Sequence, residues 1–155
     1  MSKIVNVRTV RMLTEKFQLH LLLHSADLVE NELRRQLALI GVRPRQARIL
    51  DALSRMEPAS QIGVARAFNL TPASMSTMTA RLIEAGFINR EIDPSEARSN
   101  LLRLTDRGRS KLHDIHKAWR EVDAIITDTI GAENAAILAK LTRELRDGLG
   151  GNVPG

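Results

Sequence analysis

The sequence predicts a mainly α-helical protein with a small β-hairpin, arranged as a winged helix-turn-helix with further helices at both ends. Three observations carry this prediction. Apolar residues recur every three or four positions along most of the chain, which is typical of amphipathic helices. Residues 88–104 instead alternate apolar and polar positions around a polar turn, which indicates a hairpin. Aromatic residues make up only 3% of the chain, so the core must consist of aliphatic residues and Met.

The first expected helix spans residues 10–40. Its apolar stripe includes Phe17, Leu21 and Leu28, and Gly41 is a suitable stop. A helix of roughly 30 residues is long for a chain of this size. We therefore expect its apolar face to need a partner.

The middle of the chain predicts three short helices. The first spans residues 44–56, and the second follows Ser60 as N-cap and ends near Phe68. The third is capped by Thr71, begins with Pro72 and continues to residue 85, where a glycine follows. The residues expected to face inward are Ala47, Ile49, Leu50, Leu53, Ile62, Val64, Ala65, Phe68, Met75, Met78, Leu82 and Ile83.

Two more helices follow the hairpin. Thr105 caps the first, and Gly131 separates it from the last, which we expect over residues 133–147. An apolar seam repeats every three or four residues along the first of them, at Leu112, Ile115, Trp119, Val122 and Ile126. The tail, GLGGNVPG, is expected to be disordered. The expected domains are residues 1–42, 43–109 and 110–148, with the tail at 149–155.

Composition and charge limit the function. The chain has no cysteine, which excludes disulfides, Cys-ligated zinc and thiol redox chemistry. No apolar run approaches the roughly 18 residues that span a bilayer, and the start, MSKIVNVRTVRML, lacks the apolar core of a signal peptide. We therefore expect a cytoplasmic protein without a membrane partner.

The net charge of +5 is concentrated in the middle of the chain. Residues 43–109 hold 11 arginines, no lysine and 7 acidic residues. Arginine's planar fork suits phosphate oxygens and base edges better than lysine does. On charge alone, an ordinary solvated basic surface explains the pattern equally well.

Two short helices joined by a tight turn form a helix-turn-helix, whose second helix can lie in the major groove of DNA. The helix that begins at LTPASMSTMTARL has small and hydroxylic outward residues, which let base edges approach closely. An ordinary surface helix with Ser and Thr caps remains the alternative. The candidate DNA-binding residues here are Thr71, Pro72, Ala73, Ser74, Ser76, Thr77 and Arg81.

A hairpin directly after a helix-turn-helix is a wing. An arginine near its tip, Arg98, can enter the adjacent minor groove, where A·T-rich tracts concentrate negative potential. Glu96 can pair with Arg98 and orient it, Arg90 can reach a phosphate or brace the wing, and Ser95 lies at the tip. The alternative for Arg98 is a solvated turn residue.

The stretch GFINREIDPSEARSNLLRLTDRG resembles the MarR family of bacterial transcription regulators. That family's pattern is a Gly, an apolar pair and an Arg before a wing that ends in Asp-Arg-Arg, then Leu-Thr and a Gly. The matching residues are Gly86, Arg90, Arg98, Leu104, Thr105 and Gly108. Glu96 stands for the wing Asp, and Ala97 departs from the pattern where the family has its first wing Arg.

The resemblance implies a homodimer that binds a pseudo-palindromic operator in double-stranded DNA, usually as a repressor released by a small effector. The effector class is a small aromatic or amphipathic acid, bound between the dimer helices and the winged unit. The residues that we expect at such a ligand site are Arg11, Met12, Phe17, His20, His24 and Arg45. No cofactor is implied.

Three alternatives stay open. The pairs His20–His24 and His113–His116 have spacings that can hold a metal ion, which would give a metal-responsive regulator; satisfied interface histidines are the plainer interpretation. A winged helix can also serve as a protein–protein adaptor without DNA binding. We find no Gly-rich phosphate loop, nucleophile elbow or zinc-hydrolase spacing, so we do not expect an enzyme.

Overall fold

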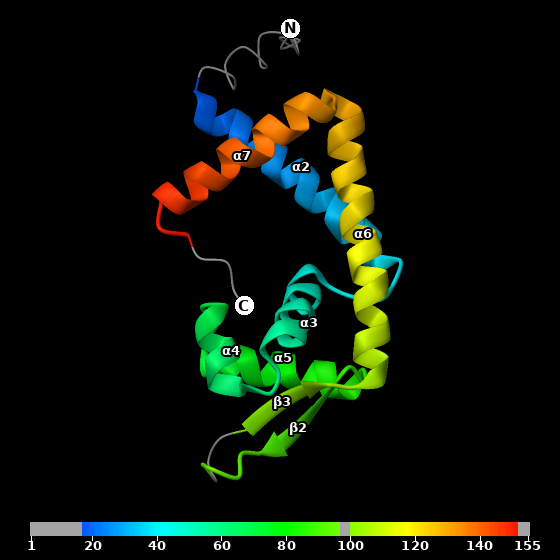
Figure 1. Ribbon diagram of the computed structural model, residues 1–155, viewed down its shortest axis with the longest axis vertical. Coiled ribbons are helices and arrows are strands. Elements are labelled where there is room, and N and C mark those ends of the chain that lie inside the picture. Colours follow the sequence, from blue (N-terminus) through cyan, green and yellow to red (C-terminus); the bar gives the residue numbers. More distant parts are fainter. Residues whose placement is uncertain (1–16, 97–99, 152–155) are drawn as a thin grey trace, which may run out of the picture.

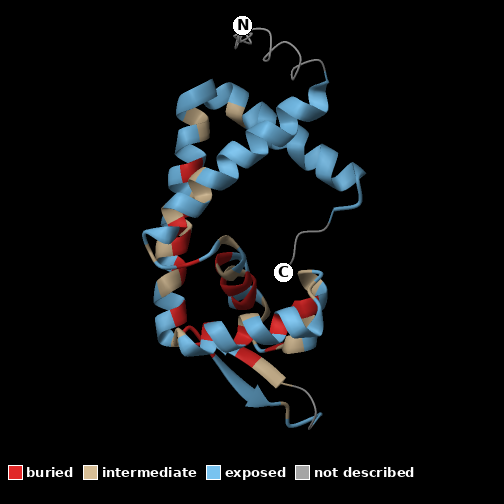
Figure 2. Ribbon diagram, turned by 180° about the vertical axis from the view of Figure 1, so that it is seen from behind, coloured by how far each residue is buried: buried red, intermediate tan, exposed pale blue. Residues whose placement is uncertain are grey.

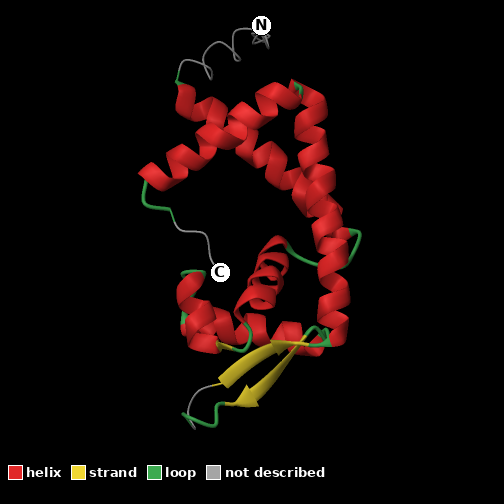
Figure 3. Cartoon of the chain, viewed as in Figure 1, coloured by secondary structure: helices red, strands yellow, loops and turns green. Residues whose placement is uncertain are grey.

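The computed structural model describes residues 17–96 and 100–151 of the chain. It is mainly helical with one small antiparallel sheet (Figure 3), which confirms the predicted fold class. The elements in chain order are α2 Gln18–Ala38, α3 Pro44–Met56, β1 Ala59–Ser60, α4 Gln61–Ala67, α5 Pro72–Glu84, β2 Ile88–Ile92, β3 Asn100–Leu104, α6 Asp106–Ile130 and α7 Ala132–Gly148.

The molecule has two parts that share the long helix α6 (Figure 1). One part, which we call the reading head, contains α3, α4, α5, the sheet and the first half of α6. The other part, the helical arm, contains α2, α7 and the second half of α6. Buried residues gather in the reading head, whereas the arm is almost entirely exposed (Figure 2). Only the reading head therefore has a core of its own within one chain.

The core of the reading head is built around α3. Its predicted inner face, Ala47, Ile49, Leu50 and Leu53, is buried completely, which confirms that part of the prediction. Leu102 and Ile88 of the sheet and Leu82 of α5 pack into the same cluster. Each fully buried aliphatic side chain of this kind contributes about 1.5–3 kcal/mol relative to an exposed one.

Side-chain caps begin three helices where the sequence predicts them. The Ser60 hydroxyl accepts the Gly63 N–H at 3.0 Å, and the Thr71 hydroxyl accepts the Ser74 N–H at 3.1 Å. The Thr105 hydroxyl accepts the Gly108 N–H at 3.0 Å. Each bond satisfies an N–H that has no partner inside its helix.

The hairpin pairs β2 with β3 in antiparallel register, with Ile88 opposite Leu104 and Arg90 opposite Leu102. A third strand, β1, pairs on the far side of β3 and makes the strand order β1-β3-β2. Strand β1 was not predicted from the sequence, because two residues are too few to show an alternating pattern.

The N-terminal helix differs from its prediction. Phe17 is extended, with φ −120° and ψ 132°, and α2 begins at Gln18 instead of running from residue 10. Residues 10–16 of the expected helix lie outside the described residues. The helix ends at Ala38, shortly before Gly41, which has a φ of +71°.

Two predicted inner residues are exposed. Ile62 is 56% exposed and Ile83 is 36% exposed, whereas Thr79 of α5 is only 1% exposed. In α5 the packing face therefore runs through Met75, Thr79 and Leu82. The prediction that Ile83 faces inward was wrong. It was made because Ile83 is apolar, but the residue of α5 that is buried is Thr79.

At the C-terminus, α7 covers residues 132–148 and starts after Gly131, whose φ is +84°. The expected tail begins at Gly148, yet the N–H groups of Leu149 and Gly151 bond to the carbonyls of Leu145 and Arg146. Residues 149–151 thus form a turn at the helix end instead of a disordered tail, and residues 152–155 lie outside the described part. Across residues 17–96 and 100–151, no helix is both long and apolar enough to cross a membrane.

Candidate nucleic-acid interface

The helix-turn-helix is formed by α4, a turn at residues 68–70, and α5. Asn69 in the turn has a φ of +50°, a left-handed conformation that Asn tolerates better than most residues. Every predicted contact residue of α5 is exposed, and the helix buries its opposite face in the core. These exposed residues are Thr71, Pro72, Ala73, Ser74, Ser76, Thr77 and Arg81.

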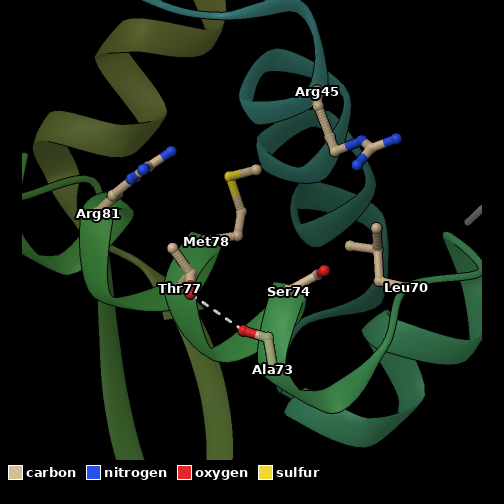
Figure 4. Close-up of a pocket in the computed structure, with 7 residues that line it drawn as sticks. All are labelled: Arg45, Leu70, Ala73, Ser74, Thr77, Met78 and Arg81. Carbon is tan, nitrogen blue, oxygen red and sulfur yellow. Dashed lines mark hydrogen bonds between the residues drawn. The ribbon is translucent and has the colours of Figure 1, made fainter.

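Most hydroxyls on this exposed face already have partners. Thr71 donates to the Ser74 hydroxyl at 2.9 Å. Thr77 donates to the backbone carbonyl of Ala73 at 3.1 Å, the bond drawn in Figure 4. Within the described residues, Ser76 has no intramolecular partner for its hydroxyl. The face is therefore less polar than its Ser and Thr content suggests.

The wing presents Arg90 and a structured tip. Arg90 is exposed on β2. Asp93 accepts hydrogen bonds from the Ser95 hydroxyl at 2.6 Å and from the Ser95 N–H at 2.8 Å. These two bonds hold the pKa of the Asp93 carboxyl below its usual range. Arg98 and Ala97 lie outside the described residues, so the predicted minor-groove contact and its pairing with Glu96 stay predictions.

Arg103 is a second described cation of the wing, and it was not among the residues predicted from the sequence. Its Nε lies 3.2 Å from a carboxylate oxygen of Glu91 on the neighbouring strand. Both side chains are about half exposed, at 45% and 51%. Such a pair contributes little stability by itself, so Arg103 remains available to a phosphate.

A hollow of about 340 Å³ lies between α3 and α5. Figure 4 shows Arg45 on α3 and Arg81 on α5 at opposite sides of it. Its remaining lining residues are Leu70, Ala73, Ser74, Thr77 and Met78. The hollow therefore combines two guanidinium groups with an apolar wall, and it borders the exposed face of α5.

Further arginines extend this cationic region. An adjoining hollow of about 290 Å³ is lined by Arg45 and Arg81 together with Arg43 and with Arg34 of α2, which pairs with Glu30 in the same lining at 2.6 Å. Sequence reasoning missed Arg34 and Arg43 as site residues. The spacing of 34, 43 and 81 along the chain gives no signal that three different segments meet.

Arg81 and the wing arginine Arg90 have different surroundings in the described residues. Arg81 faces α3 and the end of α2, in hollows that Arg90 does not line. Arg90 instead lies on the wing, and Arg98 is outside the described part.

The predicted ligand residues that the structure describes lie on two helices. Phe17, His20 and His24 are exposed at the start of α2, and the hollows that Arg45 of α3 lines do not include them. The Phe17 and His20 rings meet edge to face at 6.0 Å between centroids. Arg11 and Met12 lie outside the described residues. Of the described residues in that set, only Arg45 lines a hollow together with α5.

The histidines do not form a metal site in the described part of the chain. His116 Nε2 lies 2.7 Å from Asp51 Oδ1, and Asp51 also pairs with Arg55 at 2.9 Å. His113 on the same helix is exposed. Among residues 17–96 and 100–151, no three His, Asp or Glu side chains group closely enough to hold an ion. The contact of His116 with Asp51 instead joins α6 to α3.

We compared the chain with protein families and with solved structures. Residues 42–99 match the model of the MarR family. The uncharacterized HTH-type transcriptional regulator YhjH of Bacillus subtilis is 30% identical over 73 residues, which are 47% of this chain and 41% of YhjH. The chain thus spans less than half the length of that relative.

Two solved structures share the fold over most of both chains. A crystal structure of MarR has a TM-score of 0.72 at 21% identity, covering 96% of this chain and 94% of its own. The transcriptional repressor CouR, bound to a 23-mer DNA duplex, has a TM-score of 0.78 at 22% identity, covering 84% and 93%. Both likenesses extend beyond residues 42–99 and include helices of the arm.

Proposed function

We propose that this chain, whose residues 42–99 are a MarR-family domain, is a homodimeric transcription regulator that binds a pseudo-palindromic operator in double-stranded DNA. The observation that carries the proposal is the placement of α5. This helix exposes one face, buries the opposite face in the core, and is followed directly by the wing. CouR supports it, because a repressor of the same fold is bound to a DNA duplex. A protein of this class occupies the cytoplasm, where its DNA is.

The contacts with DNA divide into two kinds. Side chains of α5 enter the major groove and contact base edges. Arg90, Arg98 and Arg103 of the wing bind phosphates or the minor groove beside it. Pro72 has no N–H and the Ser74 N–H already bonds to Thr71, so the N–H of Ala73 is left at the start of α5 to hold a phosphate.

The helical arm supports the homodimer. No residue of α7 is buried, and Leu37 is the only buried residue of α2. Yet both helices carry exposed apolar side chains, among them Leu19, Leu22, Leu28, Ile137, Leu141 and Leu145. Monomeric proteins rarely expose apolar patches of this extent. A second copy of the chain, packing arm against arm, covers these faces and sets two reading heads side by side.

The proposal also includes a small-molecule effector that binds beside α5. The hollow beside α5 suits a small aromatic or amphipathic acid, since Arg45 and Arg81 can bind its carboxylate and Leu70 and Met78 can contact its apolar body. A ligand there touches Ala73, Ser74 and Thr77, which belong to the DNA-facing helix. Binding of the acid and of DNA would then compete, which is the behaviour of a repressor that is released by its ligand.

The experiment that tests the main proposal is selection of genomic DNA fragments on the purified protein, followed by a salt titration on the enriched fragment. We expect one A·T-rich palindrome, with affinity that falls steeply as salt rises because phosphate contacts release counterions. If no fragment is enriched over bulk DNA, the regulator proposal fails and a protein–protein adaptor takes its place.

A further inference from the structure

The exposed face of α5 is unusual in what it lacks. Residues 72–80, PASMSTMTA, contain no Arg, Lys, Asn, Gln, Asp or Glu. Those side chains make the common bidentate contacts with guanine and adenine and the acceptor contact with cytosine. If α5 enters a major groove, its first two turns must therefore recognise bases by other means.

The hydroxyls of α5 are only partly free to do so. Thr77 donates its proton to the Ala73 carbonyl, and the Ser74 hydroxyl accepts the proton of Thr71. Ser76 alone presents a hydroxyl without an intramolecular partner among the described residues of this face. The part of Thr77 that is left for a DNA base is chiefly its methyl group.

The position of Thr77 on the helix gives that methyl its importance. Ala73, Thr77 and Ala80 are spaced i, i+4 and i+7, are all exposed, and lie opposite the buried Met75, Thr79 and Leu82. The centre of the DNA-facing surface is thus made of methyl groups. In the major groove, the only methyl group that a base pair presents is the C5-methyl of thymine.

We propose that Thr77 is a specificity-determining residue and that its methyl, flanked by those of Ala73 and Ala80, recognises thymine C5-methyl groups in each half-site. This inference rests on the proposed function, because it names what α5 recognises once it lies in the groove. Ser76 and the proton of the Ser74 hydroxyl, which only accepts from Thr71, supply the hydrogen bonds of this readout, and the arginines of the wing supply affinity that is independent of the major-groove sequence. The operator half-site should then carry thymines at the base pairs that face Thr77 and its neighbours.

The test uses the full-length protein and its selected operator, with thymines of the half-site replaced one at a time by deoxyuridine. Deoxyuridine pairs like thymine and lacks only the methyl. At one or more positions we expect affinity to fall roughly fourfold, the fold-change that corresponds to about 0.8 kcal/mol for one buried methyl-sized group. Placing 5-methylcytosine at neutral positions serves as a control for general effects of an added methyl.

Two protein variants separate the methyl from the hydroxyl. Thr77→Ser keeps the hydroxyl and loses the methyl, and we expect it to bind the thymine operator roughly fourfold more weakly. On the deoxyuridine operator it should bind as well as wild type, because the contact is already absent. Thr77→Val keeps a methyl and should bind the thymine operator within about twofold of wild type.

A matched control is Thr129→Ser on α6. Thr129 makes the same kind of bond, donating to the Ile125 carbonyl four residues earlier, but it lies in the helical arm. This variant should leave DNA affinity unchanged, and thermal unfolding of all three variants checks that the fold is kept.

Three results would overturn the inference. The first is a selected operator that tolerates deoxyuridine at every position, and the second is a loss of affinity in Thr77→Val but not in Thr77→Ser, which would assign recognition to the hydroxyl. In both cases the proposed function stands and only the methyl readout fails. The third is a protein that enriches no DNA at all, which removes the proposed function and this inference together.

Discussion

Gly108 of α6 lies so close to Phe87 that a Cβ atom on residue 108 would stand 2.1 Å from the Phe87 carbonyl oxygen. That carbonyl is fixed in place, because it accepts the Thr105 N–H at 3.0 Å. Thr105 also donates its hydroxyl to the Gly86 carbonyl at 2.6 Å. The start of α6 is therefore locked against the turn between α5 and the wing, with no space for a side chain.

Replacing Gly108 by Ala should destabilise the protein by about 2–3 kcal/mol, since the new methyl forces the helix away from a backbone atom that cannot move. Urea unfolding followed by circular dichroism measures the change. Gly148→Ala is the control, because a Cβ at that helical glycine meets nothing within 4 Å. Equal stability of the two variants would contradict the close approach.

Thr79 is 1% exposed, and its hydroxyl has no hydrogen-bond partner. Thr79→Val removes this buried unsatisfied group at nearly constant volume, and we expect the free energy of unfolding to rise by about 1 kcal/mol. Thr79→Ser keeps the hydroxyl, loses a methyl and should lower it by a similar amount. A destabilised valine variant would show that the hydroxyl is satisfied by an ordered water.

The Asp93 carboxylate at the wing tip should titrate below its ordinary pKa of 3.8. Because the pKa is lowered in the folded chain, the contribution of its Ser95 bonds is complete above the ordinary value. It is lost as pH falls through the lowered value. NMR titration of the Asp93 carboxyl measures the midpoint, and Ser95→Ala should move it back up. An unchanged midpoint in that variant would assign the shift to another cause.

Arg98→Ala should weaken operator binding by about 1–3 kcal/mol, the scale of one good groove contact. Fluorescence anisotropy at about 200 mM salt keeps non-specific binding low. Arg143→Ala on α7 removes the same charge from the helical arm and should have little effect. Wild-type affinity in the Arg98 variant would leave the wing without its proposed role.

Leu141 is 54% exposed on α7 within the single chain. If it is buried between two copies, Leu141→Glu places an unpaired charge in that interface, and light scattering should give a mass near the 17.3 kDa of one chain. Arg143→Glu, two residues further on the same helix, changes charge away from the apolar stripe and should leave the dimer intact. A monomeric wild-type protein would end the homodimer proposal.

Local signals in the sequence predicted the reading head well. Thr71, Pro72 and Thr105 are residues whose own side chains determine where a helix begins, and the helices start where these residues stand. The alternation of residues 88–92 is likewise a local pattern, and it predicted the antiparallel hairpin that the structure contains. Which side chains are buried depends instead on packing between elements. For this reason the burial of Thr79 was not predicted, and Ile62 was wrongly expected to face inward.

Functional residues were harder to predict because several depend on tertiary contacts. Arg34, Arg43 and Arg81 come from three segments, and only the folded chain brings them to one hollow. His116 was considered as one of a pair with His113 on the same helix, whereas its actual contact is Asp51, 65 residues away in the chain. No spacing rule along one helix could have found either arrangement.

The long helix α6 has a mechanical consequence. Its 25 residues form a rod of about 37 Å, whose first turn is fixed to the wing junction and whose far end lies in the arm. A tilt of about 5° about one end displaces the other by about 3 Å, close to the roughly 3.4 Å rise of one base pair. In a dimer, a small angular adjustment where the arms meet would therefore shift each recognition helix by nearly a full base-pair step. The half-site spacing that the dimer binds would therefore depend on the angle at which the two arms meet.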